Sequence, residues 1–198
     1  MDNTIYFMTP DSYESELVGE PVYKPNIEQK NKYFILSLSG GKDSTALLLK
    51  FLEFNVYLDE VVYVNIGKEM PEMEDHINKL EKRVKNAEQG YIKFTRLEPE
   101  KDFRYWLGVH EKTRGENKGK KGYGWSDFQN RWCTSQLKIQ TLKKYYRKVK
   151  KRENKNNRPI DIDTEIVEFV GIAYNEKERT KKYVDKRIKE FNLVGFEM

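Results

Sequence analysis

Short apolar runs alternate with segments of helical periodicity through the middle of the chain. Residues 34–38 form an apolar run that ends just before two glycines, and residues 44–54 carry leucines and phenylalanine at helical spacing. The order then repeats: a β-branched run at 61–64 precedes a segment from Pro71 to Ala87 in which apolar residues recur every three or four positions. Pro71 suits the first turn of a helix. The pattern therefore predicts two consecutive strand–helix units.

The second half continues this alternation less regularly. We predict a third strand at 91–97, a short helix at 101–107, a further strand at 165–172 and a charged helix over about 175–191. Strands that alternate with helices are typical of a mostly parallel sheet with right-handed crossovers. The expected fold is therefore α/β, a Rossmann-like doubly wound sheet with helices on both faces.

Length and local composition indicate the domain organisation. A chain of 198 residues is typical of one globular unit. Residues 1–32 contain three prolines and no sustained period, so we expect an irregular lead-in followed by a single nucleotide-binding domain over 33–198. Residues 114–124, with four glycines and four cations, are expected to form a mobile surface loop, and the cation-dense residues 143–158 a solvated surface.

Composition narrows the classes of function. The chain has 37% hydrophobic and 35% charged residues and a formal net charge of +5, which favours anionic partners such as nucleotides or nucleic acid. No apolar stretch is long enough to span a membrane and the first residues do not form a signal peptide, so we expect a cytoplasmic protein with no membrane partner. The single cysteine, Cys133, excludes an internal disulfide and a metal site built from the chain's own thiols.

The strongest chemical signal is the segment between the first predicted strand and the first predicted helix. Two adjacent glycines let backbone N–H groups approach an oxyanion, and the start of the helix adds partial positive charge. Neighbouring serines add hydroxyl donors, and the aspartate suits a Mg²⁺ held through water, or a helix cap. The alternative is an ordinary strand-to-helix turn capped by Asp or Ser. The segment reads Ser39, Gly40, Gly41, Lys42, Asp43 and Ser44.

This segment resembles the SGGxDS loop of the PP-loop ATP pyrophosphatases, the adenine nucleotide alpha-hydrolase superfamily. Within that superfamily the chain is most similar to the phosphoadenosine phosphosulfate (PAPS) reductase family, because three further segments match in order. Residues 65–72, NIGKEMPE, resemble D-T-G-x-x-F-P-E-T; residues 131–134, RWCT, with Lys138 resemble R-W-C-T…K; and residues 171–179, GIAYNEKER, resemble G-I-R-x-x-E-S-x-R. The resemblance implies a nucleotide site that uses all four segments.

The residues that the resemblance assigns fall into two groups. Asn65, Ile66, Gly67 and Glu176 join the loop residues in binding the nucleotide, and Asp43 is the expected metal ligand. The expected catalytic residues are Arg131, Lys138, Arg179 and Cys133.

The chain departs from the family pattern at several of these positions. Asn65, Ala173 and Lys177 stand where the family has Asp, Arg and Ser. The family's C-terminal E-C-G-I/L-H segment, whose cysteine attacks the sulfonyl sulfur, has no counterpart in residues 192–198. Reduction of PAPS would therefore depend on Cys133 or on a partner's thiol.

Several residues have a structural alternative to a chemical role. Arg131, Lys138 and Arg179 suit an oxyanion site, and the alternative is that they are solvated surface cations. Cys133 lies beside cations that favour thiolate, yet a small buried hydrophobe is the alternative. We expect His76 and His110 to be structural or surface histidines. The tyrosines near the basic loop and three tryptophans suit either base stacking or a place in the core. The tryptophans are Trp106, Trp125 and Trp132.

Three functions remain open from the sequence. The first is an enzyme of the adenylyltransferase type that binds Mg-ATP and cleaves it between the α- and β-phosphates to adenylylate an unidentified second substrate, with nucleic acid as one candidate. The second is a PAPS reductase-type oxidoreductase that uses Cys133 or a thioredoxin-type partner. The third is a non-catalytic module that binds a nucleotide, nucleic acid or a partner protein. A homodimer is an open arrangement in each case.

Overall fold

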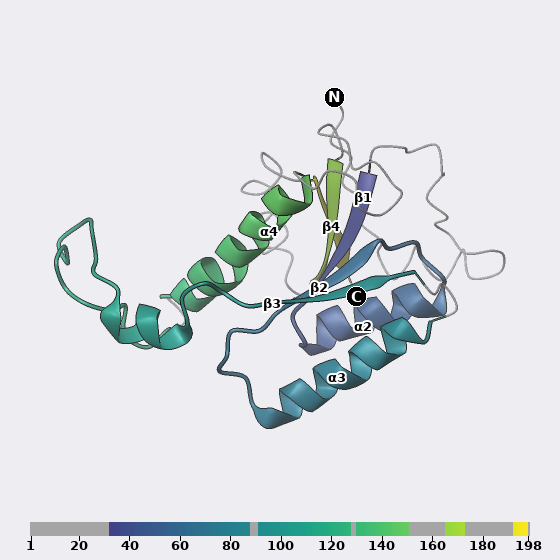
Figure 1. The fold of residues 1–198 in the computed structure, drawn as a ribbon, viewed down its shortest axis with the longest axis horizontal. Helices are drawn as coiled ribbons and strands as arrows, with labels where there is room; N and C mark the ends of the chain where they lie inside the picture. The colour runs from purple at the N-terminus through teal and green to yellow at the C-terminus, as the bar shows by residue number, and fades with distance from the viewer. Residues whose placement is uncertain (1–31, 88–90, 128–129, 151–164, 173–191, 198) are drawn as a thin grey trace.

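The computed structural model describes residues 32–87, 91–127, 130–150, 165–172 and 192–197. A five-stranded parallel sheet forms its centre, with strand order β3-β2-β1-β4-β5 (Figure 1). The Rossmann-like doubly wound fold predicted from the sequence is thus confirmed. The strands are β1 (Lys32–Leu38), β2 (Glu60–Val64), β3 (Lys93–Leu97), β4 (Glu165–Ile172) and β5 (Asn192–Glu197).

Helices cover both faces of this sheet. α2 (Lys42–Glu53) and α3 (Pro71–Lys85) lie on one face, and α4 (Gln140–Lys150) lies on the other (Figure 1). Two short π-helical segments, η1 (Tyr105–Val109) and η2 (Cys133–Ile139), lie between β3 and α4 along the chain. Among the described residues, no helix is long and apolar enough to cross a membrane.

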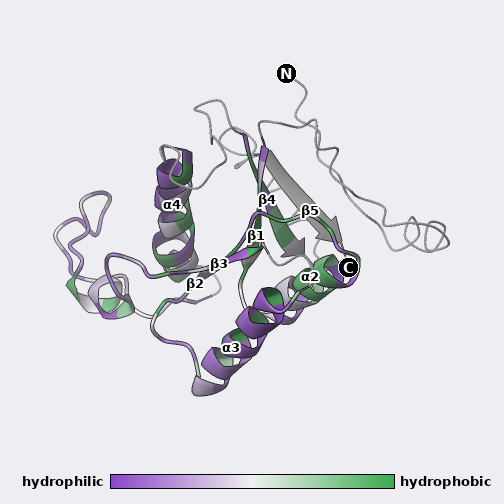
Figure 2. Cartoon of the chain, turned by 45° about the vertical axis from the view of Figure 1, so that its right-hand side comes forward, coloured by the Kyte–Doolittle hydropathy of each residue, from purple (hydrophilic) through white to green (hydrophobic). Residues whose placement is uncertain are grey.

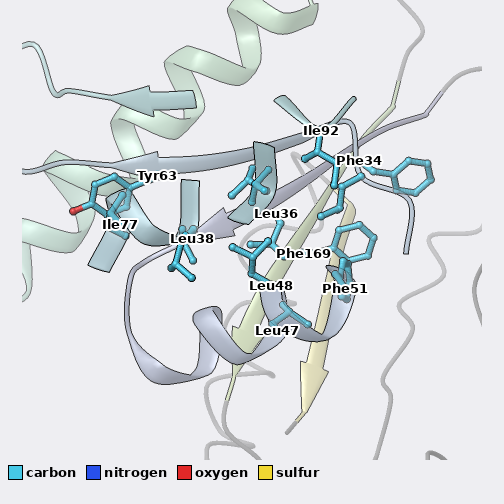
Figure 3. Packing of buried hydrophobic residues seen from close by; sticks show 14 of the residues in the cluster. Phe34, Leu36, Leu38, Leu47, Leu48, Phe51, Tyr63, Ile77, Ile92 and Phe169 are labelled. Atoms are coloured by element: carbon cyan, nitrogen blue, oxygen red, sulfur yellow. The ribbon is translucent and has the colours of Figure 1, made fainter. Parts of the chain in front are cut away.

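The alternation of side chains along the strands produces two hydrophobic clusters. Phe34, Leu36 and Leu38 of β1 point toward α2 and α3, where they meet Leu48 and other buried residues of the helices (Figure 3). Ile35, between them, points toward α4. In Figure 2 the hydrophobic colour is concentrated in the central strands and α2, whereas α3 and α4 carry long hydrophilic stretches. The strands β1, β2 and β4 are therefore buried on both faces, as strands of parallel sheets usually are.

The α4 face of the sheet also buries charged groups. Glu60 of β2 is fully buried and accepts hydrogen bonds from Tyr145 Oη at 2.6 Å, Lys93 Nζ at 2.7 Å and Thr95 Oγ1. Burial and the bond to Glu60 raise the pKa of Tyr145. Burial alone would lower the pKa of Lys93, but its bonds to Glu60 and Tyr145 outweigh that effect and raise it. These polar contacts join β2, β3 and α4.

A second buried glutamate occupies the same face of the sheet. Glu168 of β4 accepts a hydrogen bond from Ser37 Oγ, which lies 3.1 Å from Tyr146 Oη of α4. The two tyrosines of α4 therefore lie over two carboxylates of the sheet, and the hydroxyls at the ring ends reach polar partners without leaving the interior.

The structure corrects three local expectations. The sequence analysis predicted no strand at the end of the chain, yet β5 pairs parallel to β4 over the whole of its length. Residues 143–158 were expected to be surface, but α4 buries Tyr145, Tyr146 and Val149, because these positions recur on one side of the helix. The helix expected at 101–107 lies later, and η1 ends at Val109.

The remaining predicted elements agree with the structure or fall outside the described residues. β1, β2, β3, β4, α2 and α3 occupy the predicted segments, apart from shifts of one or two residues at their ends and the exclusion of Ala87 from α3. The lead-in at 1–32, up to the start of β1, and the helix predicted over 175–191 lie outside the described part of the chain.

Candidate functional site

The phosphate loop lies where the order of strands reverses. β2 and β3 follow β1 on one side of the sheet, whereas β4 and β5 lie on its other side, so β1 is the strand from which the chain winds both ways. The helices change face at the same point, since α2 and α3 cover one side and α4 the other. Ligands of open α/β sheets bind at such a switch point, beyond the carboxyl ends of the strands. Residues 39–44 occupy this position, directly after β1.

Two serines close the loop through their hydroxyl groups. Ser39 Oγ lies 2.9 Å from Ser44 Oγ, and the Ser39 N–H donates to Ser44 Oγ at 3.2 Å. Ser44 Oγ in turn donates to the Gly41 carbonyl at 3.1 Å. Ser44 is buried and Ser39 is exposed. The loop is therefore tied together from within, with Ser39 and Gly41 open to solvent and Gly40 buried between them.

The first turn of α2 presents backbone donors at the open side of the loop. The first helical hydrogen bond runs from the Thr45 N–H to the Gly41 carbonyl at 3.0 Å, so the amides of Lys42, Asp43 and Ser44 precede it. No side chain among the described residues caps the helix at Gly41. The alternative from the sequence, an ordinary turn capped by Asp or Ser, predicts a side-chain cap that is not formed.

The two loop glycines serve different purposes. Gly40 has φ +79°, and a Cβ there would lie 2.5 Å from Met73 Sδ and 3.2 Å from Ile77 Cδ1 of α3. Gly41 has an ordinary φ of −73°, and a Cβ there would meet only Ser39 Oγ, at 3.5 Å. The fold therefore requires glycine at position 40, whereas at position 41 glycine leaves open space at the helix N-terminus.

The carboxyl end of β4 packs directly against this loop. A Cβ on Gly171 would lie 2.8 Å from the backbone C and O atoms of Asp43 and from the Ser44 N atom. Gly171 opens the segment 171–179 that resembles the family's fourth motif. The structure thus brings the beginning of that motif to the phosphate loop, while Glu176 and Arg179 lie outside the described residues.

α3 supports the loop from the other side. His76 Nε2 lies 3.1 Å from Thr45 Oγ1 in the first turn of α2. Together with the contacts of Met73 and Ile77 at Gly40, this places three residues of α3 against the loop and the helix that follows it. His76 therefore has a structural contact, as predicted for it.

The loop after β2 meets the segment before α4. Asn65 Oδ1 accepts a hydrogen bond from the Gly67 N–H at 2.8 Å, which stabilises the turn where Gly67 has φ +72°. Ile66 packs on the hydrophobic cluster beneath α4. Glu69 lies 4.0 Å from Lys138 Nζ of η2. Two segments that resemble family motifs, separated by more than 60 positions in the chain, are thus adjacent.

The other residues of the R-W-C-T segment have contacts within their own part of the chain. Arg131 is exposed, and its carbonyl accepts hydrogen bonds from the Thr134 and Ser135 N–H groups at the start of η2. Cys133 is half-buried, and its Sγ lies 3.1 Å from Ser126 Oγ. None of the contacts that the described residues give Cys133 reaches residues 39–44. Among the predicted catalytic residues that the structure describes, Lys138 is therefore the one whose side chain contacts another matched segment.

The sequence analysis assigned no role to Tyr63, whose position is unusual. Tyr63 lies next to last in β2, is 1% exposed, and its hydroxyl has no hydrogen-bond partner among the described residues. Its ring points toward Ile77 of α3 (Figure 3). Burial, with added repulsion from the Glu69 and Glu74 carboxylates, raises the pKa of Tyr63 to about 12. Its position among the valines of β2 gave no signal in the sequence.

The Tyr63→Phe variant is expected to be as stable as the wild type at pH 7, or more stable by up to about 1 kcal/mol, because it removes a buried hydroxyl that lacks a partner. The raised pKa means that the unfolded chain loses the Tyr63 proton first as pH rises, so wild-type stability falls between about pH 10 and about pH 12. The melting-temperature difference between variant and wild type should therefore grow as the pH is raised from 8 to about 11. A difference that stays constant would contradict this prediction.

Residues 33–154, more than half of the chain, match the family described as the phosphoadenosine phosphosulfate reductase domain. The chain belongs to this family. The match runs from β1 through α4 and includes the phosphate loop, the loop after β2 and the segment with Arg131 and Lys138, whereas Gly171 lies beyond it. Membership in the PP-loop adenine nucleotide alpha-hydrolase superfamily, predicted from the sequence, is confirmed with it.

A comparison with curated proteins finds a distant relative of the chain. The chain is 28% identical over 179 residues to "Uncharacterized protein MJ0066" of Methanocaldococcus jannaschii. The alignment covers 89% of this chain and 30% of the relative, so the chain spans less than a third of that protein's length. No solved structure matches the chain.

Proposed function

We propose that this protein binds Mg-ATP at residues 39–44 and cleaves it between the α- and β-phosphates, transferring the adenylyl group to a second substrate. The observation that carries the proposal is the uncapped N-terminus of α2 behind an open Gly41, at the strand end where the sheet order reverses. Phosphate oxygens are the ligands that such a helix start and such a strand end favour. The exposed Ser39 adds a hydroxyl at the same place, while the buried Ser44 hydroxyl donates to the Gly41 carbonyl and holds the loop.

The residues of the loop fit a Mg²⁺–triphosphate group. Asp43 lies in the first turn of α2 and is partly exposed, and carboxylate oxygen is a ligand type that Mg²⁺ prefers. Among the described residues, no three His, Cys, Asp or Glu side chains gather as a metal site. Asp43 would therefore share the ion with phosphate oxygens and water, and the ion would neutralise phosphate charge. Lys42, exposed at the same turn, supplies further positive charge.

The proposed chemistry is an adenylyl transfer driven by positioning and charge. An oxygen of the second substrate forms a bond to the α-phosphorus, and the bridging bond to the β-phosphate breaks. Pyrophosphate leaves with the bonding electrons and stays at the backbone donors of the loop, while the substrate's proton passes to solvent. Lys138 and Arg131 are the described cations proposed to stabilise charge at the α-phosphate, as cations do in such transfers, with Arg179 as a third.

The second candidate is reduction of a sulfonucleotide, and family membership is the observation that favours it. The reductase would need a thiol, for which the sequence offers Cys133 or a partner protein. A sulfonucleotide and ATP share the adenosine and an α-phosphate, so the same loop would hold either ligand. Direct comparison of the two ligands therefore separates the candidates.

The decisive experiment is calorimetric titration of the protein with Mg-ATP and, separately, with PAPS. Gly41→Ala is the test variant, because the fold has room for the methyl group but the group occupies the space in front of the backbone donors. We expect at least a tenfold loss of ATP affinity, about 1.4 kcal/mol, with an unchanged melting temperature. Gly108→Ala is the matched control, since a Cβ there meets nothing within 4 Å.

Each result decides between the candidates. ATP binding that weakens in Gly41→Ala and not in Gly108→Ala supports the proposal, and release of pyrophosphate and transfer of AMP to a candidate acceptor would then be measured. Preference for PAPS would replace it with the reductase, for which Cys133→Ser is the next variant. Binding of neither ligand would contradict both candidates.

A further inference from the structure

The segment between β3 and η2 builds a small lobe from aromatic side chains. We call residues 101–127 the aromatic lobe; Figure 1 shows it extending away from the sheet, beyond the end of α4 that joins η2. Its rings pack on one another: Trp106 lies 4.5 Å from His110 and 5.9 Å from Tyr123 between centroids, and Phe103 lies 4.9 Å from Trp132 just outside the lobe. Trp106 and Trp132, two of the aromatics that the sequence offered for stacking, thus pack against other rings.

Trp125 is the exception to this packing. Its side chain is 76% exposed, although its ring touches Phe103 at a centroid distance of 5.9 Å. A single exposed apolar ring is common on protein surfaces, so the meaning of Trp125 depends on the groups around it. Phe103 supports the indole from one side, so a flat aromatic face is left open on the lobe.

Cations surround this lobe and continue onto α4. Residues 112–121 contain five cations and one acid, and α4 contains five cations and no acid. Lys112 and Lys101 lie over the rings of Tyr123 and Tyr105, 5.6 Å and 5.0 Å from the centroids. The surface therefore combines positive charge with aromatic faces, which is the composition that nucleic-acid sites use.

α4 reaches the start of the aromatic lobe at Glu100, the residue just before it. Lys144 Nζ of α4 donates to Glu100 at 2.6 Å, and this bond, together with the charges of Lys148 and Lys101, lowers the pKa of the Glu100 carboxyl. Lys101 is two positions from Phe103, whose ring contacts the ring of Trp125. The cations of α4 are thus connected to the exposed indole by a short run of neighbouring residues.

We propose that the aromatic lobe and the exposed cations of α4 bind single-stranded nucleic acid, with a base stacked on Trp125 and backbone phosphates held by Arg147, Lys148 and the cations of residues 112–121. The single-stranded form follows from the indole, because a base must be unstacked from its neighbours to lie on an exposed ring. An acidic protein segment, by contrast, would be bound by the cations alone and would leave the exposed indole without a role. This site is separate from the phosphate loop and does not require the proposed adenylyl transfer.

The test is fluorescence anisotropy with a labelled twelve-nucleotide oligouridine, without ATP, at several salt concentrations. We expect binding that weakens with salt, with a slope of log K against log salt of about −0.7 for each phosphate contact. Trp125→Ala should weaken binding about tenfold, and Trp125→Phe should retain most of the affinity because it keeps a ring to stack on. Arg147→Glu/Lys148→Glu should weaken binding at least as much and flatten the salt slope.

Matched controls lie elsewhere on the molecule. Tyr91→Ala removes an exposed ring outside the lobe, and Lys79→Glu/Lys82→Glu reverses two exposed cations on α3, across the sheet. Both should bind the oligonucleotide like the wild type. Titration of Trp125→Ala with Mg-ATP reports on the phosphate loop, so failure of this proposal is distinguished from failure of the adenylyl-transfer proposal.

Three results would overturn the proposal. One is that Trp125→Ala binds the oligouridine as tightly as the wild type does. Another is that the wild type binds a duplex of the same length as tightly as it binds the single strand. The third is displacement of the oligonucleotide by polyglutamate at matched charge concentration as effectively as by unlabelled oligouridine, which would assign the surface to acidic protein segments.

Discussion

Replacing Glu60 with alanine is expected to lower the free energy of unfolding by about 2–4 kcal/mol, because an unsatisfied buried donor costs about 1–3 kcal/mol and several donors lose their acceptor. Glu60 is fully buried and accepts hydrogen bonds from a lysine, a threonine and two tyrosines, contributed by β1, β3 and α4. Its removal leaves the threonine and tyrosine hydroxyls without this acceptor and opens a cavity beneath α4, while the Lys93 ammonium group, whose side chain is 45% exposed, turns to water. Urea denaturation of variant and wild type measures the difference.

The control for this prediction is a glutamate with the same chemistry at the surface. Glu53 pairs with Lys50 at 3.0 Å, but the Glu53 side chain is 60% exposed. Glu53→Ala is expected to cost at most about 1 kcal/mol, as for other exposed ion pairs. Should Glu60→Ala fail to fold, Glu60→Gln keeps an acceptor oxygen and is expected to give a smaller, measurable loss. A Glu60→Ala variant within 1 kcal/mol of the wild type would contradict the role assigned to this carboxylate.

Gly171→Ala is expected to reduce ATP affinity about 100-fold, although position 171 carries no ligand-binding side chain. The added Cβ would lie 2.8 Å from backbone atoms of Asp43 and Ser44, which have no flexible end that can move aside. The first turn of α2 must therefore shift away from β4 and misplace the backbone donors. Loss of two charge-assisted hydrogen bonds of about 1.5 kcal/mol each corresponds to roughly this factor.

The same substitution should also lower stability, by about 1–3 kcal/mol, because it overpacks a close contact between a strand and a helix. Calorimetric titration with Mg-ATP and thermal melting measure the two effects on one sample. Gly108→Ala, which adds the same methyl group where nothing lies within 4 Å, should change neither. Wild-type ATP affinity in Gly171→Ala would show that the contact with β4 does not position the loop.

Comparison of the two glycine variants distinguishes residues that hold the loop in position from residues at the side where phosphate binds. Gly41→Ala is expected to weaken ATP binding with little effect on stability, because its methyl group faces open space. Gly171→Ala is expected to weaken both, because its methyl group meets the backbone of the loop. The contrast tests whether the loop binds phosphate at its open side and is held from behind by the end of β4.

Local sequence patterns determined much of this protein. The apolar runs and helical periods predicted four strands and two helices at nearly their observed positions, because period and burial are coupled within each element. The loop at residues 39–44 was likewise predicted at the junction of β1 and α2, since adjacent glycines, serines and a helix start have a strong local signature. The resemblance of four short segments to one family predicted the family match over residues 33–154.

Only the tertiary structure decided which distant residues meet. Strand order places β4 beside β1, and from this follow the contact of Gly171 with the loop and the position of the loop at the switch point. The burial of Glu60 beneath Tyr145 and the approach of Lys138 to Glu69 depend on the docking of α4 and η2. β5 was missed because a six-residue strand with a central glycine has little pattern of its own and is stabilised by pairing with β4. Such contacts depend on how elements pack over long separations in the chain, and local periodicity carries no record of that packing.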